Sequence, residues 1–216
     1  MSNNKIMKYI IICSAIVLTV SCSEKYDDYN RVTKKGSLYF LEGQEDPYTG
    51  TCAAYYENGQ MSIIADFKDG KRDGHGAAWY DNGQQEYEGT YTNGTRDGIF
   101  KGWYSDGQIA VIKEYDHDTL VGKWQFWYEN GVTKEIGHYK KGERIGDWFW
   151  WYENGKSWIE ATFVDGKENG IWKMWHKNGQ LKEIGFYDNG NKTGEWITYD
   201  VNGDTLDVKI CESERL

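Results

Sequence analysis

The side chains best suited to acid–base or metal chemistry in this chain are its histidines. Imidazole transfers protons near neutral pH and binds zinc, but a metal site needs several His, Cys, Asp or Glu ligands at short spacing. None of the four histidines has such a spacing to another histidine or to a cysteine; they are His75, His117, His138 and His176. His176 occupies a position where similar stretches of the chain have tyrosine, so we expect a packed ring there. We predict no metal and no cofactor.

A series of acidic residues could in principle supply the paired carboxylates of a hydrolase. These residues are Glu57, Asp81, Glu129 and Glu153. Each stands beside an Asn-Gly pair, where turns favour polar residues without any catalytic reason. A carboxylate pair would need a separation of about 5–10 Å within a cleft. The chain also has no His-Glu-x-x-His, no Gly-x-Ser-x-Gly and no phosphate-binding glycine loop. We therefore predict that the protein is not an enzyme.

The elements that carry these residues repeat with a period of 24. Glycines recur at this spacing, and so do the turn glycines Gly59, Gly83, Gly107, Gly131, Gly155 and Gly179. Units repeated at a fixed period bury surface only against their neighbours. The predicted fold class is all-β: an elongated single sheet of stacked antiparallel hairpins. Six full units span residues 50 to 193, and a partial unit follows them.

Each unit is predicted to contain two strands and two turns. In one unit the strands are 123–128 and 133–139, with a loop from Lys140 to Ile145. Asn-Gly between the strands is a strong hairpin signal because both residues tolerate positive φ. Asp118 replaces the glycine of the second loop in one unit, and we expect a distorted loop there.

Symmetric pairing about the Asn-Gly turns places large residues opposite small ones. Trp124 is expected to face Gly137, and Trp148 to face Ala161. One face, with Trp148 and Phe163, is more apolar and is taken as the core side. Such complementarity is what close packing across a ladder requires.

The opposite face carries one aromatic residue per unit, and we take this row as the candidate binding face. Its members are Trp103, Trp127, Trp151 and Trp175, with Trp158 beside Trp151. Symmetric pairing sets Trp127 beside Lys134 and Trp175 beside Lys182, as two cation–π pairs. The alternative is that the row is a second packed face of the ribbon.

The chain begins with features of export. Lys5 and Lys8 precede an apolar run from Ile10 to Val20, which is shorter than the roughly 20 residues needed to span a bilayer. The run leads to Ser21-Cys22 and resembles a bacterial lipoprotein signal, although such signals usually have Leu where Thr19 stands. The resemblance implies lipidation of Cys22 and anchoring in the cell envelope, at the outer membrane or cell surface; the alternative is ordinary cleavage and secretion.

This interpretation gives residues 1–21 as signal peptide, 22–36 as a polar tether and 37–216 as the repeat domain. The formal net charge is −9. An acidic body argues against nucleic acid as a partner, and we expect membrane attachment only through the lipid.

The recurring pattern also resembles a known family. Gly170-Ile171-Trp172-Lys173-Met174-Trp175-His176-Lys177-Asn178-Gly179-Gln180 is similar to the MORN-repeat variant of bacterial YwqK-like proteins. The resemblance covers about residues 38–204. It implies stacked hairpins, and it implies an antitoxin or envelope immunity role, since such proteins are commonly named antitoxins. A looser similarity links the chain to choline- and glucan-binding repeats, which differ in placing the aromatic pair after the turn.

Three functional interpretations follow. The first is a monomeric envelope lipoprotein that binds a protein partner along its sheet. The second is a glycan- or cell-wall-binding module that uses the aromatic row. The third is a structural spacer without a ligand.

Overall fold

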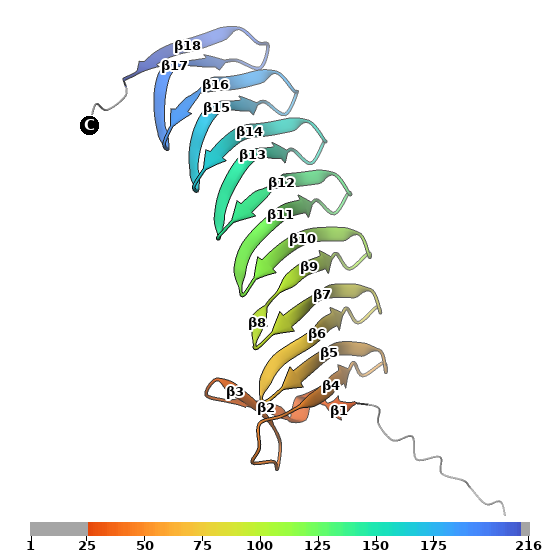
Figure 1. The fold of residues 1–216 in the computed structure, drawn as a ribbon. Coiled ribbons are helices and arrows are strands. Elements are labelled where there is room, and N and C mark those ends of the chain that lie inside the picture. Colours follow the sequence, from red (N-terminus) through yellow and green to blue (C-terminus); the bar gives the residue numbers. More distant parts are fainter. Residues whose placement is uncertain (1–25, 213–216) are drawn as a thin grey trace, which may run out of the picture.

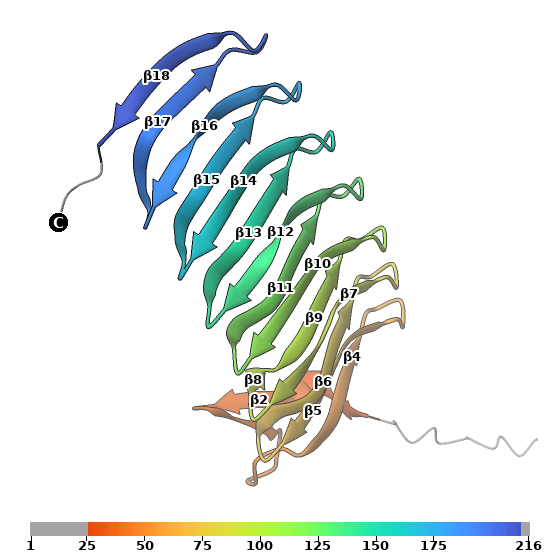
Figure 2. The ribbon, with the colours of Figure 1, turned by 45° about the horizontal axis from the view of Figure 1, so that its top comes forward.

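The protein forms one long, curved and twisted sheet, shown in two views in Figures 1 and 2. The structure is a computed structural model, and it describes residues 26–212. From β4 to β18 the strands follow one another along the sheet in chain order, except that the short β8 lies off this path and pairs with β7; each hairpin is therefore added beside the one before it. The strands of the array are antiparallel, and this confirms the predicted all-β array of stacked hairpins.

The elements have the following bounds: β1 Asp27–Asp28, η1 Tyr29–Arg31, β2 Val32–Lys35, β3 Leu38–Leu41, β4 Gly50–Tyr55, β5 Met61–Lys68, β6 Lys71–Trp79, β7 Gln85–Thr92, β8 Thr95–Arg96, β9 Gly98–Trp103, β10 Ile109–Asp116, β11 Thr119–Trp127, β12 Thr133–Lys140, β13 Glu143–Trp151, β14 Ser157–Val164, β15 Lys167–Trp175, β16 Leu181–Asp188, β17 Asn191–Tyr199 and β18 Thr205–Cys211. Among the described residues, no helix has the length and apolar character needed to cross a membrane.

The predicted pairing of large with small residues is confirmed. Trp124 lies opposite Gly137, and Trp148 lies opposite Ala161. A Cβ atom added to Gly137 would come within 2.2 Å of the Trp148 ring on the following strand, so this position admits only glycine without rearrangement. Phe100 and Trp196 lie in the same way over Gly89 and Gly185 of their preceding strands.

The Asn-Gly turns differ from the prediction. In the turn after β11, the N–H of Gly131 donates to the carbonyl of Tyr128 at 2.9 Å, and Gly131 has φ 79°. Asn130 is not among the residues with positive φ. This is a three-residue loop closed by a left-handed glycine, and it shifts the pairing by one residue at the turn. Trp127 accordingly lies opposite Thr133 instead of Lys134.

The tight two-residue turns are found at the other end of the strands. Lys141 and Gly142 both have positive φ, 53° and 81°, and strands β12 and β13 continue up to them. The predicted loop from Lys140 to Ile145 is therefore mostly strand. The loop containing Asp118 is not distorted, because His117 and Asp118 have φ values of 48° and 64°, in the same region as the other turns. Asp tolerates this conformation through its short polar side chain.

The core lies on one face of this single layer, which we call the ring face; it carries Trp148, Phe163, Trp172 and Trp196. Trp148 is 0% exposed although no second layer covers it. Its neighbours provide the cover: the Tyr139 ring centroid lies 5.1 Å from that of Trp148, and the Arg144 guanidinium lies 4.7 Å above the indole. Aromatic side chains thus bury one another along the ribbon.

The first strand of the array is covered by the segment before it. β1 pairs in parallel with the outer edge of β4, and β2 forms a hairpin with β3. Tyr29 and Val32 pack against a buried cluster that includes Cys52 and Phe67. The sequence did not predict these elements within the proposed tether 22–36, because few apolar residues mark them and their partners lie far along the chain. The signal peptide and Cys22 lie outside the described residues.

The last strand ends differently. Within the described residues, β18 pairs only with β17 and forms the end of the sheet. Cys52 in β4 and Cys211 in β18 lie at opposite ends of the array and are both free thiols, as expected for a sheet that does not close.

Candidate functional site

The face opposite the ring face, which we call the open face, carries Trp151, Ile171, Trp175 and Phe186. Its side chains alternate along each strand with those of the ring face. Ile171 lies directly opposite Phe186 on β16 and is 57% exposed. Two large apolar side chains are thus held side by side in contact with solvent.

Apolar residues that are partly or fully exposed continue from this pair to the end of the sheet. Ile184 lies opposite Ile197, and Ile197 lies opposite Val208 of β18. Ile210, on the same face of β18, is 65% exposed. A shallow groove of about 260 Å³ lies above Gly185, bounded by Ile171 and Ile197 among others. Large apolar patches exposed on a folded protein mark interaction sites.

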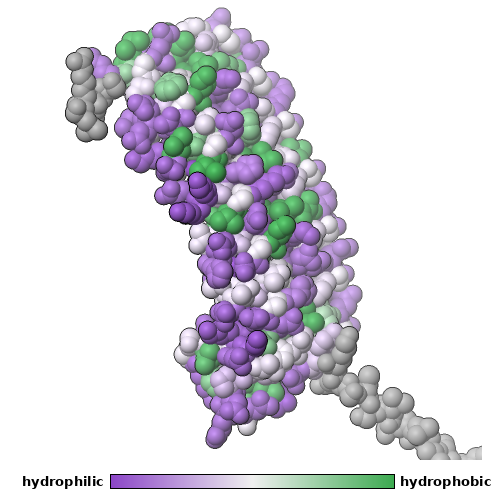
Figure 3. Space-filling view, in the orientation of Figure 1, coloured by the Kyte–Doolittle hydropathy of each residue, from purple (hydrophilic) through white to green (hydrophobic). Residues whose placement is uncertain are grey.

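The surface seen in Figure 3 shows how limited such patches are. Hydrophobic side chains form separate patches among hydrophilic ones over the length of the array. Most of the exposed large apolar side chains among the described residues lie from Ile171 onward, so the apolar stripe of the last four strands is a local feature.

The predicted aromatic row lies on the open face at the turn ends of the strands. Trp103, Trp127, Trp151 and Trp175 end β9, β11, β13 and β15, and all four are partly buried. The row does not form the predicted pairs. The Lys134 ammonium lies 5.0 Å from the Phe126 ring and 5.2 Å from the Tyr128 ring, and Trp158 packs on Tyr152 with centroids 5.7 Å apart.

The cause of these differences is the bulge at each Asn-Gly turn. It places Ser157 opposite Trp151, and Leu181 opposite Trp175. Lys134, Trp158 and Lys182 are the residues skipped in the pairing. Ring contact for Trp151 comes from its own strand, where Phe149 lies 6.1 Å away.

The turn residues also join successive repeats. The Tyr152 hydroxyl donates to the Trp175 carbonyl at 2.7 Å, and the Asn154 amide donates to the Lys177 carbonyl at 2.9 Å. The His176 ring makes the equivalent contact to the Tyr199 carbonyl at 3.0 Å, which confirms a structural role for it. The tyrosine and asparagine of the repeat therefore fix the spacing of the turns, and with it the spacing of the aromatic row.

One group of side chains could hold a metal ion, and the sequence did not indicate it. Ligand atoms of Asp97, Asp116 and His117 lie within 4.8 Å of one another. His117 Nδ1 lies 2.6 Å from an Asp116 carboxylate oxygen, and this contact raises the pKa of the His117 ring. Asp97 precedes β9, whereas Asp116 ends β10 and His117 follows it, so no short spacing in the chain reveals the group. The ion pair between Asp116 and His117 already explains why these two side chains lie together without a metal ion.

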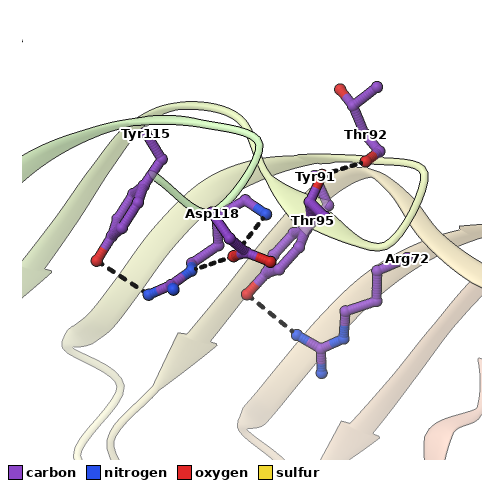
Figure 4. Close-up of polar contacts among 7 residues, drawn as sticks. Arg72, Tyr91, Thr92, Thr95, Tyr115 and Asp118 are labelled. Carbon is purple, nitrogen blue, oxygen red and sulfur yellow. Dashed lines mark hydrogen bonds and ion pairs between the residues drawn. The ribbon is translucent and has the colours of Figure 1, made fainter. Parts of the chain in front are cut away.

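Figure 4 shows a second polar arrangement, in which arginine and tyrosine alternate between units on the ring face. Arg96 donates through Nη1 to the Tyr115 hydroxyl at 2.9 Å and through Nε to Asp118 at 2.7 Å. The hydrogen bond to Asp118 is the main cause that raises the pKa of Arg96. In the preceding unit Arg72 donates to Tyr91 at 3.4 Å and to Tyr29 at 2.8 Å.

Comparison with known proteins agrees with this architecture. The model of the MORN repeat variant family matches five segments, which together make up just over half of the chain: 48–69, 96–117, 120–141, 144–165 and 168–189. No curated protein matches the chain. The hairpin of β6 and β7 lies between the first two matched segments and has the same pairing, with Gly76 in place of the large ring. The chain therefore belongs to the MORN repeat variant family.

Proposed function

We propose that this protein is a non-catalytic scaffold that binds a protein partner on the open face of its last units. The docking surface consists of Trp151, Ile171, Trp175, Phe186, Val208 and Ile210. The observation that carries the proposal is the apolar stripe across β15–β18, partly or fully exposed to solvent, which ends at a strand whose outer edge is unpaired within the described residues.

The two ends of the sheet support a polypeptide as the occupant. At the first end, β1 already pairs with the outer edge of β4. At the other end, the outer backbone groups of β18 are unpaired within the described residues. An added strand would satisfy those groups, and its side chains would cover Val208 and Ile210. A glycan would stack on rings but offers no such ladder.

Charges limit how a partner can approach. Asp207 and Lys209 of β18 project from the ring face and oppose Thr198 and Trp196. These two charged side chains hinder pairing by a strand that places apolar residues on the ring face. The apolar residues of β18 all lie on the open face, so the partner's apolar side chains belong there.

We further propose a bacterial envelope location through a lipid on Cys22, and an antitoxin or immunity role like that of YwqK-like proteins. The leader before Cys22 and the repeat pattern support this proposal. An immunity protein has to present a rigid surface and needs no catalytic group. A sheet whose successive turns are joined by side-chain hydrogen bonds suits this role.

The test is affinity capture with the full chain and two variants. Ile171→Lys places a charge in the docking surface, while Ile99→Lys places one at the same position of a repeat three units earlier, where Ile99 is similarly exposed at 55%. A partner retained by the wild type and by Ile99→Lys, but lost by Ile171→Lys, supports the docking surface. Equal retention by both variants contradicts it, and retention of cell-wall glycan alone favours the glycan-binding function instead.

The aromatic row needs a separate variant. Trp151→Ala is expected to weaken capture, because it removes a ring that forms part of the docking surface and contacts Phe149. The unfolding midpoint is measured on the same sample. A large fall in the midpoint would show that Trp151 is a packing residue and would remove it from the docking surface.

A further inference from the structure

A hollow of about 280 Å³ opens on the ring face between β7, β9 and β10. Its walls include the rings of Tyr87 and Phe100, the side chain of Val111, and two basic groups, Arg96 and Lys113. This size is at the lower end of the range for small-molecule sites, and the combination of apolar walls with a few converging charges is typical of them.

Gly102 lines the hollow at a position that later units fill with a large side chain. The equivalent residues of the next three units are Phe126, Trp150 and Met174. Gly102 lies opposite Val111, and its φ is not in the left-handed region, so the backbone itself does not require glycine. A large side chain at this position would occupy space in the hollow that Arg96 and Lys113 also line.

Lys113 also departs from the repeat. The equivalent residues in neighbouring units are Gly89, Gly137 and Ala161, over which the large rings pack. The Lys113 ammonium lies 5.3 Å from the centroid of the Trp124 ring, and burial, followed by the charge of Arg96, lowers the pKa of Lys113. Within residues 26–212, no carboxylate forms an ion pair with it. A half-buried ammonium without an anion opposes folding, which is consistent with a group that a ligand neutralises.

Arg96 differs from Lys113 in being held and neutralised. Asp118 accepts from its Nε, and Tyr115 accepts from its Nη1. Its second terminal nitrogen has no such partner within the described residues. The hollow therefore presents one donor held in place, Arg96, and one positive charge that no carboxylate of the described residues balances, Lys113.

We propose that this hollow binds a carboxylate joined to an aromatic or branched apolar group, with the carboxylate between Lys113 and Arg96 and the apolar group against Phe100 and Val111. A single carboxylate balances the one unpaired charge. A doubly charged phosphate would leave an excess negative charge in a protein whose net charge is already −9. The carboxylate can belong to a free acid or to the last residue of a peptide chain. The site is on the ring face, so it is independent of the docking surface proposed above.

The experiment is titration calorimetry of the full chain with phenylacetate, and with the neutral analogue 2-phenylethanol. We expect millimolar binding of phenylacetate, as for a ligand of its size, and at least about tenfold weaker binding of the alcohol. N-acetylphenylalanine distinguishes the two sources: tighter binding than phenylacetate indicates a chain terminus, and weaker binding indicates a free acid. Absence of phenylacetate binding overturns the proposal, and so does equal binding of the alcohol or tighter binding of inorganic phosphate.

Two variants locate the binding. Lys113→Met keeps the length of the side chain and removes the charge, and we expect at least about tenfold weaker phenylacetate binding with an unchanged or higher unfolding midpoint. Lys192→Met is the matched control, because Lys192 lies far from the hollow, in a later unit, and its ammonium is already paired with Glu183 at 2.7 Å. Wild-type affinity in Lys113→Met, or an equal loss in both variants, contradicts the assignment.

Discussion

The Tyr128 hydroxyl donates a hydrogen bond of 2.9 Å to the carbonyl of Trp151, one repeat further along the chain. The same contact recurs from Tyr56 to Trp79 and from Tyr104 to Trp127. The tyrosine of the Tyr-x-Asn-Gly pattern therefore connects one hairpin to the next, beyond the pairing of the strands. Its burial raises the pKa of the Tyr128 hydroxyl and keeps it a donor.

Replacing Tyr128 by Phe should destabilise the array by about 0.5–1.5 kcal/mol, the net value of one hydrogen bond whose acceptor loses its partner. Denaturant unfolding measures the change. Tyr55→Phe is the control, since Tyr55 is an exposed residue on the open face. An effect equal to that of the control would mean that the contact between repeats contributes nothing to stability.

Gly137→Ala should destabilise the protein by about 1–3 kcal/mol, since the new Cβ would lie 2.2 Å from the Trp148 ring. Gly102→Ala is the matched comparison. Its Cβ would meet a Val111 methyl at 3.0 Å, so we expect a smaller loss. Thermal unfolding of both variants gives the order. A smaller loss at Gly137 than at Gly102 would contradict the close packing of ring on glycine.

The two cysteines of the described array should differ in reactivity. Cys52 is fully buried, and burial raises the pKa of its thiol to about 12, so little thiolate forms at neutral pH. Cys211 is partly exposed at the last strand. Maleimide labelling of the native chain followed by peptide mapping should find Cys211 modified and Cys52 intact. A peptide in which the two are bonded would show instead that the sheet closes.

Glu135 should make stability depend on pH. Burial raises its pKa, against the opposing effect of Arg144, whose Nη2 lies 3.8 Å from the carboxylate. Because the pKa of Glu135 is higher in the folded state, its protonated form stabilises the fold at pH values below its pKa in the unfolded chain. This stabilisation is lost as the pH rises through the pKa of the folded state. The stability of Glu135→Gln relative to the wild type should therefore increase as the pH rises from about 4 to about 7. Unfolding midpoints at both pH values test this, and a difference that does not vary with pH would contradict it.

Cys22 should carry the lipid. Growth with a clickable palmitate is expected to label the wild type and not Cys22→Ser. The residue lies outside the described part of the chain, so this prediction rests on the leader sequence. Equal labelling of both proteins would favour ordinary signal cleavage and secretion.

The sequence by itself determined the all-β array and the pairing of Trp148 with Ala161. Both follow from local signals: a 24-residue period, turn glycines and alternation of side chains. Residues on the two strands of a hairpin are close in the chain, so their register follows from the position of the turn.

Tertiary structure decided which side chains meet near each turn and at the two ends of the sheet. The bulge at Asn130-Gly131 depends on which residue takes positive φ, and the sequence allows either choice; as a result Lys134 lies over Phe126 and not beside Trp127. Pairing of Asp27 with Cys52 joins residues far apart in the chain, which no local pattern encodes. The hollow beside Lys113 likewise depends on the walls that several strands supply. Such contacts result from packing, which is decided only when the whole sheet forms.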